Sequence, residues 1–159
     1  ISLNGGCALF QNGEATSVPL PRLAMYLVNT GTPMATTGEC VVDVKTRFEH
    51  DLIWNDFEAV TRALEKAVRE NKLEDVQAAI RENHRLLTRI GVVPAKVQQF
   101  IAEIEAQGGA AKICGAGSVM GDAAGMTLVL ADRAPADLCK KYGFELSTVR
   151  GDPLGARIV

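Results

Sequence analysis

The chain has 159 residues, and its 17 lysine and arginine residues against 19 aspartate and glutamate residues give a formal net charge of −2 at pH 7. This balance leaves no basic excess for a phosphate backbone, which argues against nucleic-acid binding. No apolar run approaches the roughly 18 residues of a membrane span, and the start has no signal-peptide pattern. We therefore expect residues 1–159 to form a single cytoplasmic domain, without membrane contact and with a hydrophobic core of its own.

The cysteines are scattered along the chain. They lack the paired spacing of a zinc site and the density of a disulfide framework, and most stand among apolar neighbours. We therefore predict buried, reduced thiols at Cys7, Cys40, Cys114 and Cys139.

The beginning of the chain predicts a hairpin and a buried strand. Asn12 and Gly13 can supply the positive φ angles of a tight reversal between strands at residues 7–10 and 14–18. The continuous apolar run at 23–29 has the length of a strand, and we predict that this strand lies centrally in a sheet.

Apolar residues at helical spacing fill the middle of the chain. At the start of this region a threonine can cap free amides, and Glu39 occupies the first turn, where the helix dipole favours a negative charge. Helices are predicted from Thr36 or Thr37 to about His50, from Asn55 or Asp56 to a break at Asn71, over 73–90, and from Pro94 to the Gly108-Gly109 pair.

The last third of the chain returns to strand patterns. Strands are predicted at 110–114 and 125–131, followed by a short helix at 135–142 and an edge strand at 144–149. Strands therefore lie at both ends of the sequence, and helices gather between them. This order indicates an α+β fold, with an antiparallel sheet and helices packed on one face.

Residues Lys112 to Gly125, KICGAGSVMGDAAG, form a glycine-rich loop between two of these strands. It is not the loop of P-loop NTPases, since no Gly-Lys-Ser/Thr follows Gly115. The dinucleotide-binding pattern also fails, because Met120 occupies the third glycine position and a strand follows in place of a helix. Two interpretations stay open from these residues alone: a tight turn between strands, or a backbone surface that contacts a phosphate or a substrate.

The segment GGAAKICGAGSVMGDAAGMTLVL at 108–130 resembles the third conserved motif of the GHMP kinases, which include galactokinase, homoserine kinase and mevalonate kinase. Three further segments resemble the mevalonate kinases of that family: ISLNGGCALFQNG at 1–13, NTGTPMATTGECV at 29–41, and the helix pair that precedes the loop from Asn83. Their order and spacing hold from Ile1 to Ala131. The chain thus resembles the carboxy-terminal half of a mevalonate kinase-like protein, for which the family implies a ferredoxin-like fold.

The resemblance implies Mg²⁺-assisted transfer of the ATP γ-phosphoryl group to the hydroxyl of mevalonate, a step of isoprenoid precursor synthesis. Family members hold ATP, Mg²⁺ and the catalytic aspartate and lysine mainly in the amino-terminal half, so no catalytic residue or metal ligand is expected in this chain. The expected partners are a mevalonate-like substrate and that amino-terminal half, and the isolated chain is expected to be inactive. An apolar face left without that half would favour a homodimer.

The resemblance also implies the site residues. Gly115, Ala116, Gly117 and Ser118 match the motif that contacts the acceptor substrate, and Thr36 matches a threonine near the entrance of the site. Relatives commonly have further glycines where Ser118, Val119 and Met120 stand, and an arginine where Met34 stands. These departures leave the identity of the phosphate acceptor open, with phosphomevalonate or another small hydroxylated metabolite as alternatives.

Other functions stay open beside this one. A stand-alone ferredoxin-like module could use the same loop to bind a small anion, or the chain could be a structural subunit that docks on a separate amino-terminal chain. Because Ile1 begins inside a strand pattern, we expect the gene to encode a longer chain. We interpret His50 and His84 as exposed surface residues without a catalytic function. Asp122 is interpreted as an exposed loop carboxylate, with a position facing the site as the alternative.

Overall fold

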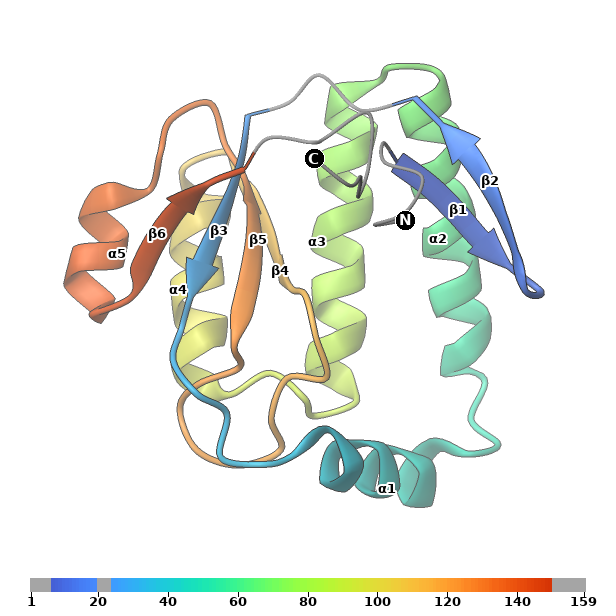
Figure 1. The fold of residues 1–159 in the computed structure, drawn as a ribbon, viewed down its shortest axis with the longest axis horizontal. Helices are drawn as coiled ribbons and strands as arrows, with labels where there is room; N and C mark the ends of the chain where they lie inside the picture. The colour runs from blue at the N-terminus through green and yellow to red at the C-terminus, as the bar shows by residue number, and fades with distance from the viewer. Residues whose placement is uncertain (1–6, 20–23, 150–159) are drawn as a thin grey trace, which may run out of the picture.

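The computed structural model describes residues 7–19 and 24–149. Figure 1 shows an antiparallel sheet of four strands in the order β4-β5-β3-β6, and a separate hairpin of β1 and β2. The strands are β1 (Cys7–Gln11), β2 (Glu14–Val18), β3 (Met25–Asn29), β4 (Ala110–Ile113), β5 (Met126–Leu130) and β6 (Glu145–Thr148). The α+β prediction is confirmed, with β3 central and β6 at an edge. Residues 1–6 and Leu23, which the sequence assigned to strands, lie outside the described residues.

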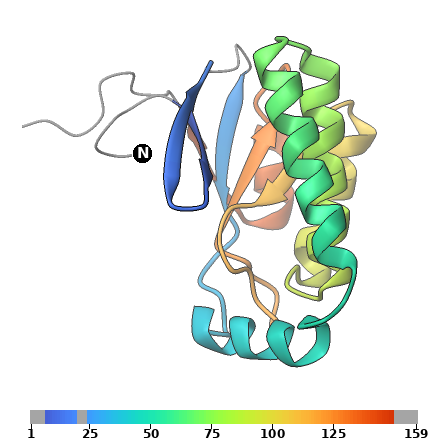
Figure 2. The same ribbon diagram turned by 90° about the vertical axis from the view of Figure 1, so that its right-hand side faces the viewer.

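The hairpin turn forms where the sequence predicted it. Asn12 and Gly13 have φ angles of 52° and 85°, and Gln11 pairs with Glu14 across the turn. In Figure 2 the hairpin lies on one side of the four-stranded sheet, whereas the long helices lie on the other.

The helices follow the predicted spacing closely. They are α1 (Thr37–Phe48), α2 (Ile53–Arg69), α3 (Leu73–Arg89), α4 (Ala95–Ala106) and α5 (Ala136–Tyr142). Helix α2 begins at Ile53, two residues before the predicted Asn55, and Leu52 is its N-cap residue. The Ile53 amide donates a hydrogen bond to the carboxylate of Asp51, just before the cap, at 2.7 Å. Asn71, at a φ of 55°, separates α2 from α3 as predicted. Within the described parts of the chain, no helix is both long and apolar enough to cross a membrane.

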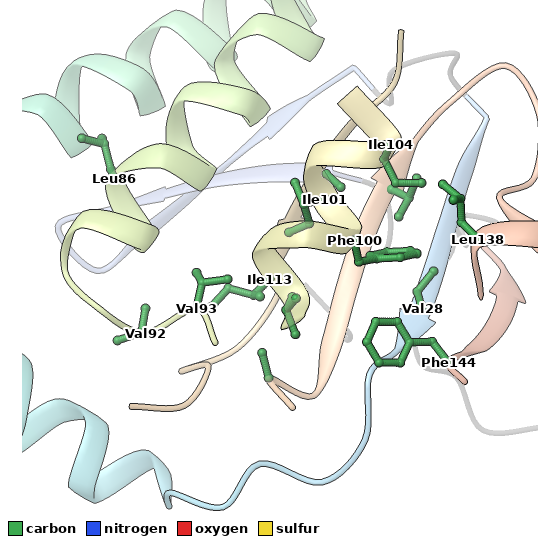
Figure 3. Close-up of a cluster of buried hydrophobic side chains, with 14 of the residues drawn as sticks. Val28, Leu86, Val92, Val93, Phe100, Ile101, Ile104, Ile113, Leu138 and Phe144 are labelled. Carbon is green, nitrogen blue, oxygen red and sulfur yellow. The ribbon is translucent and has the colours of Figure 1, made fainter. Parts of the chain in front are cut away.

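The main core lies between the sheet and helices α4 and α5. Phe100 of α4 is fully buried and packs edge to face against Phe144, with ring centres 5.2 Å apart. Figure 3 shows side chains of α4 pointing toward Val28 of β3 and Ile113 of β4, and Val92 and Val93 closing the end of this core. The core thus fixes β4 and the turn between α3 and α4 relative to each other.

Helix α3 packs along the β4 edge of the sheet. Ile80 contacts Ala110 and Leu130, which lie in a cluster separate from the main core. The Arg81 guanidinium donates hydrogen bonds to the carbonyl oxygens of Gly108 and Gly109, at 3.0 and 2.7 Å from Nη2. These contacts fix the start of β4, and therefore the position at which the glycine loop leaves the sheet.

The cysteine prediction is partly wrong. Cys40 and Cys139 are buried, but Cys7 is only half-buried and Cys114 is exposed. Strand β4 ends at Ile113, so Cys114 already belongs to the loop. All four thiols are free.

The prediction of an exposed His84 is wrong. Its side chain is buried on α3, and no hydrogen-bond partner is described for its Nδ1 atom. Asn83 and Arg85 suggested a polar surface, but His84 follows Ile80 by one helical turn and faces α4, where it borders a hollow with Thr88 and other residues. Burial, and secondarily the nearby Arg85 charge, lower the pKa of His84 to about 4.

We expect the free energy of unfolding to fall as the pH is lowered from 6.5 to about 4. In this interval the unfolded chain protonates His84, whereas the folded chain keeps it neutral, so protons favour unfolding. Urea unfolding at neutral and at mildly acidic pH measures the effect. His84→Gln should show a smaller loss of stability on acidification than the wild type, and His50→Gln, at an exposed position, serves as the control. Equal losses in His84→Gln and wild type would contradict the assignment.

Candidate functional site

The glycine loop between β4 and β5 lies at the end of the sheet that faces α1 (Figure 1). Its two ends are tied to neighbouring strands. The Cys114 amide donates a hydrogen bond to the Met126 carbonyl at 2.8 Å, and the Thr30 hydroxyl donates to the Gly125 carbonyl at 2.8 Å while accepting from the Ala124 amide at 2.9 Å. The loop is therefore a fixed extension of the sheet.

Gly117 lies where only glycine fits. Its φ is +68°, and an added Cβ would lie 2.0 Å from the Val92 carbonyl oxygen and 2.6 Å from Cδ1 of Ile113. The next residue, Ser118, donates its backbone amide to the same Val92 oxygen at 2.9 Å. The loop consequently rests directly on the turn between α3 and α4.

The Ser118 side chain joins the loop to the segment that precedes α1. It is 1% exposed, accepts hydrogen bonds from the amides of Ala35 and Met120 at 3.2 Å, and donates to the Met120 carbonyl at 2.5 Å. Cys40 Sγ on α1 adds a weak contact to the Gly117 carbonyl at 3.9 Å. The Ser118 side chain therefore has a structural function at this position.

Gly115 and Ala116 are placed differently from the two residues that follow them. They border an open cleft of about 430 Å³, and a Cβ added at Gly115 would meet nothing within 4 Å. Throughout residues 7–19 and 24–149, no acceptor is described for the amide of Gly115 or of Ala116. Two backbone donors are thus available to an anion or a carbonyl oxygen in the cleft.

The other walls of the cleft come from distant parts of the chain. They are mostly apolar, with Lys45 and Glu49 forming an ion pair at 3.5 Å on the rim. The lining side chains come from α1 (Cys40, Val41, Val44, Lys45), from Glu49 and Trp54 beyond it, and from Leu87, Ile90 and Val92. These residues were not predicted from the sequence; the one available signal was the apolar group Cys40, Val41, Val42 and Val44, which is too wide for a helix with a single buried face.

Thr36 is the N-cap of α1 and is not among the residues that line the cleft. Its backbone amide and hydroxyl donate to Glu39 Oε2 at 2.7 and 2.8 Å, and its hydroxyl accepts from the Glu39 amide at 3.3 Å. The backbone hydrogen bond, followed by the hydroxyl bond, lowers the pKa of Glu39. Substrate contact by Thr36 therefore remains a prediction, as it does for the four loop residues.

Lys112 does not line the cleft. Its Nζ atom donates to the Ile113 carbonyl at 2.8 Å, and burial lowers the pKa of its ammonium group. Burial also raises the pKa of the Cys114 thiol, an effect that Lys112 partly offsets. Neither side chain is among the residues that line the cleft.

The described residues do not fit a metal ion. Over the two described ranges, no three histidine, cysteine, aspartate or glutamate side chains gather closely enough to hold one. Mg²⁺ normally needs carboxylate, phosphate or water oxygens in octahedral arrangement. No cluster among the described residues would hold Mg²⁺ by protein ligands alone.

Gly117→Ala tests whether the loop needs its close contact with Val92. We expect it to lower the free energy of unfolding by about 2–4 kcal/mol, from left-handed strain and overpacking together. The matched change Gly115→Ala, at an open position without positive φ, should alter it by less than about 0.5 kcal/mol. Urea denaturation measures both. Equal destabilisation by the two variants would show that the loop does not rest on Val92 as described.

Comparison with known proteins shows which proteins this chain is similar to. Residues 64–121, from α2 through the loop, match the family model for the GHMP kinases C terminal. The mevalonate kinase of Pyrococcus furiosus is 30% identical over 128 residues, which cover 74% of this chain and 38% of that protein.

Two solved structures share the fold. The L. major mevalonate kinase in complex with R-mevalonate has a TM-score of 0.67 and 20% identity, over 85% of this chain and 43% of that one. The Streptococcus pneumoniae phosphomevalonate kinase in complex with phosphomevalonate and AMPPNP has a TM-score of 0.70 and 18% identity, over 86% of this chain and 43% of that one. The chain thus spans less than half the length of each of these relatives. Residues 64–121 thus match the C-terminal domain of the GHMP kinases, and the described part of the chain has the fold of these kinases.

Proposed function

We propose that this chain forms the acceptor side of an ATP-dependent GHMP-type kinase, most like mevalonate kinase. The kinase would transfer the γ-phosphoryl group of ATP to the hydroxyl of mevalonate or of a related small hydroxylated acid, as a step of isoprenoid precursor synthesis. The observation that carries this proposal is that Gly115 and Ala116, whose amides have no described acceptor, line a mostly apolar cleft.

The shape of the cleft suits such an acceptor. Glycine and alanine let the ligand approach the backbone amides, which can donate to a carboxylate or to the oxygen that receives phosphate. The apolar wall of α1 and α3 offers contact to a branched hydrocarbon chain. Phosphoryl transfer depends mainly on positioning and charge stabilisation, so a rigid acceptor wall is a direct contribution to catalysis.

The proposal divides the reaction between two parts of a larger protein. ATP, Mg²⁺ and the groups that stabilise the transferred phosphoryl would be held by an amino-terminal half, as the resemblance to the GHMP kinases implies. The 159-residue chain supplies the wall against which the acceptor lies.

The division of labour predicts that the 159-residue chain alone is inactive. Incubated with ATP, Mg²⁺ and mevalonate in a coupled ADP assay, it should give no signal above the rate without enzyme. A complete kinase that contains this chain should give steady turnover under the same conditions. Clear turnover by the chain alone would refute the division.

Ala116→Leu tests the acceptor wall in the complete kinase. The larger side chain would fill the space beside the Gly115 and Ala116 amides and displace the acceptor, so kcat/KM for mevalonate should fall by about 100-fold or more. Ala106→Leu, at the exposed end of α4, adds the same atoms away from the cleft and should leave kcat/KM unchanged. Thermal unfolding checks that both variants fold. If Ala116→Leu keeps the kcat/KM of the wild type, Ala116 does not contact the acceptor.

A further inference from the structure

We propose that Arg47 is a positioning residue for this reaction, because it sets the spacing between the α1 wall of the cleft and the glycine loop. The expected effect of Arg47 on the KM for mevalonate rests on the proposed function, whereas its expected effect on the position of α1 does not. Arg47 itself is not among the residues that line the cleft, so it acts through the segments that it joins.

Arg47 joins the last turn of α1 to the end of α3. Its Nη2 atom donates to the carbonyl oxygen of Ile90 at 2.7 Å, across 43 positions of sequence. Ile90 is the C-cap of α3, where the negative end of the helix dipole favours a cation. Asp43, one turn earlier on α1, holds the guanidinium through Nε at 3.0 Å and also through Nη2. The Phe48 ring lies 4.9 Å from the guanidinium carbon.

The turn after α3 is shaped to receive this guanidinium. Gly91 has a φ of +80°, and an added Cβ would lie 3.1 Å from Arg47 Nη2. The residue that permits the turn is thus also the one that leaves room for the arginine.

The same turn holds the glycine loop. Val92, next after Gly91, accepts the Ser118 amide at 2.9 Å. At the other end of α1, the Ala35 amide donates to Ser118 Oγ and Cys40 Sγ contacts the Gly117 carbonyl. Helix α1 is therefore fastened at both ends, and Val41 and Val44, which line the cleft, lie between these two attachments.

If Arg47 only formed an ion pair with Asp43, Arg47→Ala would have little effect. Its ion pair with Asp43 is a partly exposed i,i+4 pair, and pairs of this kind contribute little to stability. Arg62 and Glu58 form a similar pair on α2, and no hydrogen bond of Arg62 to another element is described among residues 7–19 and 24–149. Arg62→Ala is consequently the matched control, since it removes the same kind of pair without detaching a helix.

The kinetic test uses the complete kinase. With α1 detached at its last turn, Arg47→Ala should raise the KM for mevalonate about tenfold while changing kcat and the KM for ATP less than about twofold. Arg47→Lys should recover part of the loss, because a lysine can reach one carbonyl but cannot hold the carboxylate and the carbonyl together. Arg62→Ala should change none of these constants. An unchanged KM for mevalonate in Arg47→Ala, or equal rises for both substrates, would overturn the inference.

A second readout needs no activity. Trp54 is the single tryptophan of the 159-residue chain, lines the cleft, and donates its Nε1–H to the Phe48 carbonyl at 2.6 Å, next to Arg47. Its emission therefore reports on the last turn of α1. In this chain, Arg47→Ala and Arg47→Lys should shift Trp54 emission to longer wavelength and increase its quenching by acrylamide, the lysine variant less, with Arg62→Ala unchanged. Circular dichroism checks that each variant is folded.

The two readouts separate the two proposals. If Trp54 emission changes as expected but the complete protein phosphorylates no hydroxylated acid, the inference about Arg47 stands and the proposed function fails. If mevalonate is phosphorylated but Arg47→Ala changes neither the Trp54 emission nor the KM for mevalonate, the proposed function stands and the inference about Arg47 fails. Should Arg47→Ala not fold, Arg47→Lys decides by the same two measurements.

Discussion

The hydrogen bond from the Ser118 amide to the Val92 carbonyl is the contact on which the site depends. It forms because Gly117 has no side chain to separate the loop from the turn between α3 and α4. Once Gly117 and Ser118 are held beneath the surface, the two residues before them are left at the cleft with no described acceptor for their amides. The glycine loop is thus neither a simple turn nor a uniformly open surface. Its second half is buried support, and its first half borders the cleft.

The cleft is assembled from segments that are far apart in the sequence. Helix α1 provides one wall, the end of α3 and the turn after it provide the base, and the loop after β4 provides the rim. Each segment is fixed by a different kind of interaction: side-chain packing around Phe100 for β4, Ser118 for the start of α1, and the Arg47 guanidinium for its end. Rigid placement of this kind suits a reaction in which the protein contributes mainly orientation.

Local chemistry made much of the fold predictable. The Asn12-Gly13 pair predicted the hairpin, and helical spacing predicted the long helices. A threonine cap and the Glu39 charge predicted the start of α1, where the structure adds that Thr36 and Glu39 form a capping box. The prediction for His84 was wrong because its sequence neighbours are polar, whereas Ile80, one helical turn earlier, is buried. The Arg47 contact could not be predicted, since the partner of Arg47 is a backbone carbonyl, which has no residue-type signal. The loop could be found from its glycines, but its division into support and surface depends on which residue meets Val92.

The most direct test of the account follows backbone amides while the acceptor binds. In a complete kinase labelled with ¹⁵N and titrated with mevalonate, the Gly115 and Ala116 amide resonances should move the most within the loop, because they are the donors beside the cleft. The Gly117 and Ser118 resonances should move far less, since they are held below it. Saturable binding of mevalonate that leaves Gly115 and Ala116 unperturbed would contradict the central claim that their backbone forms the acceptor wall.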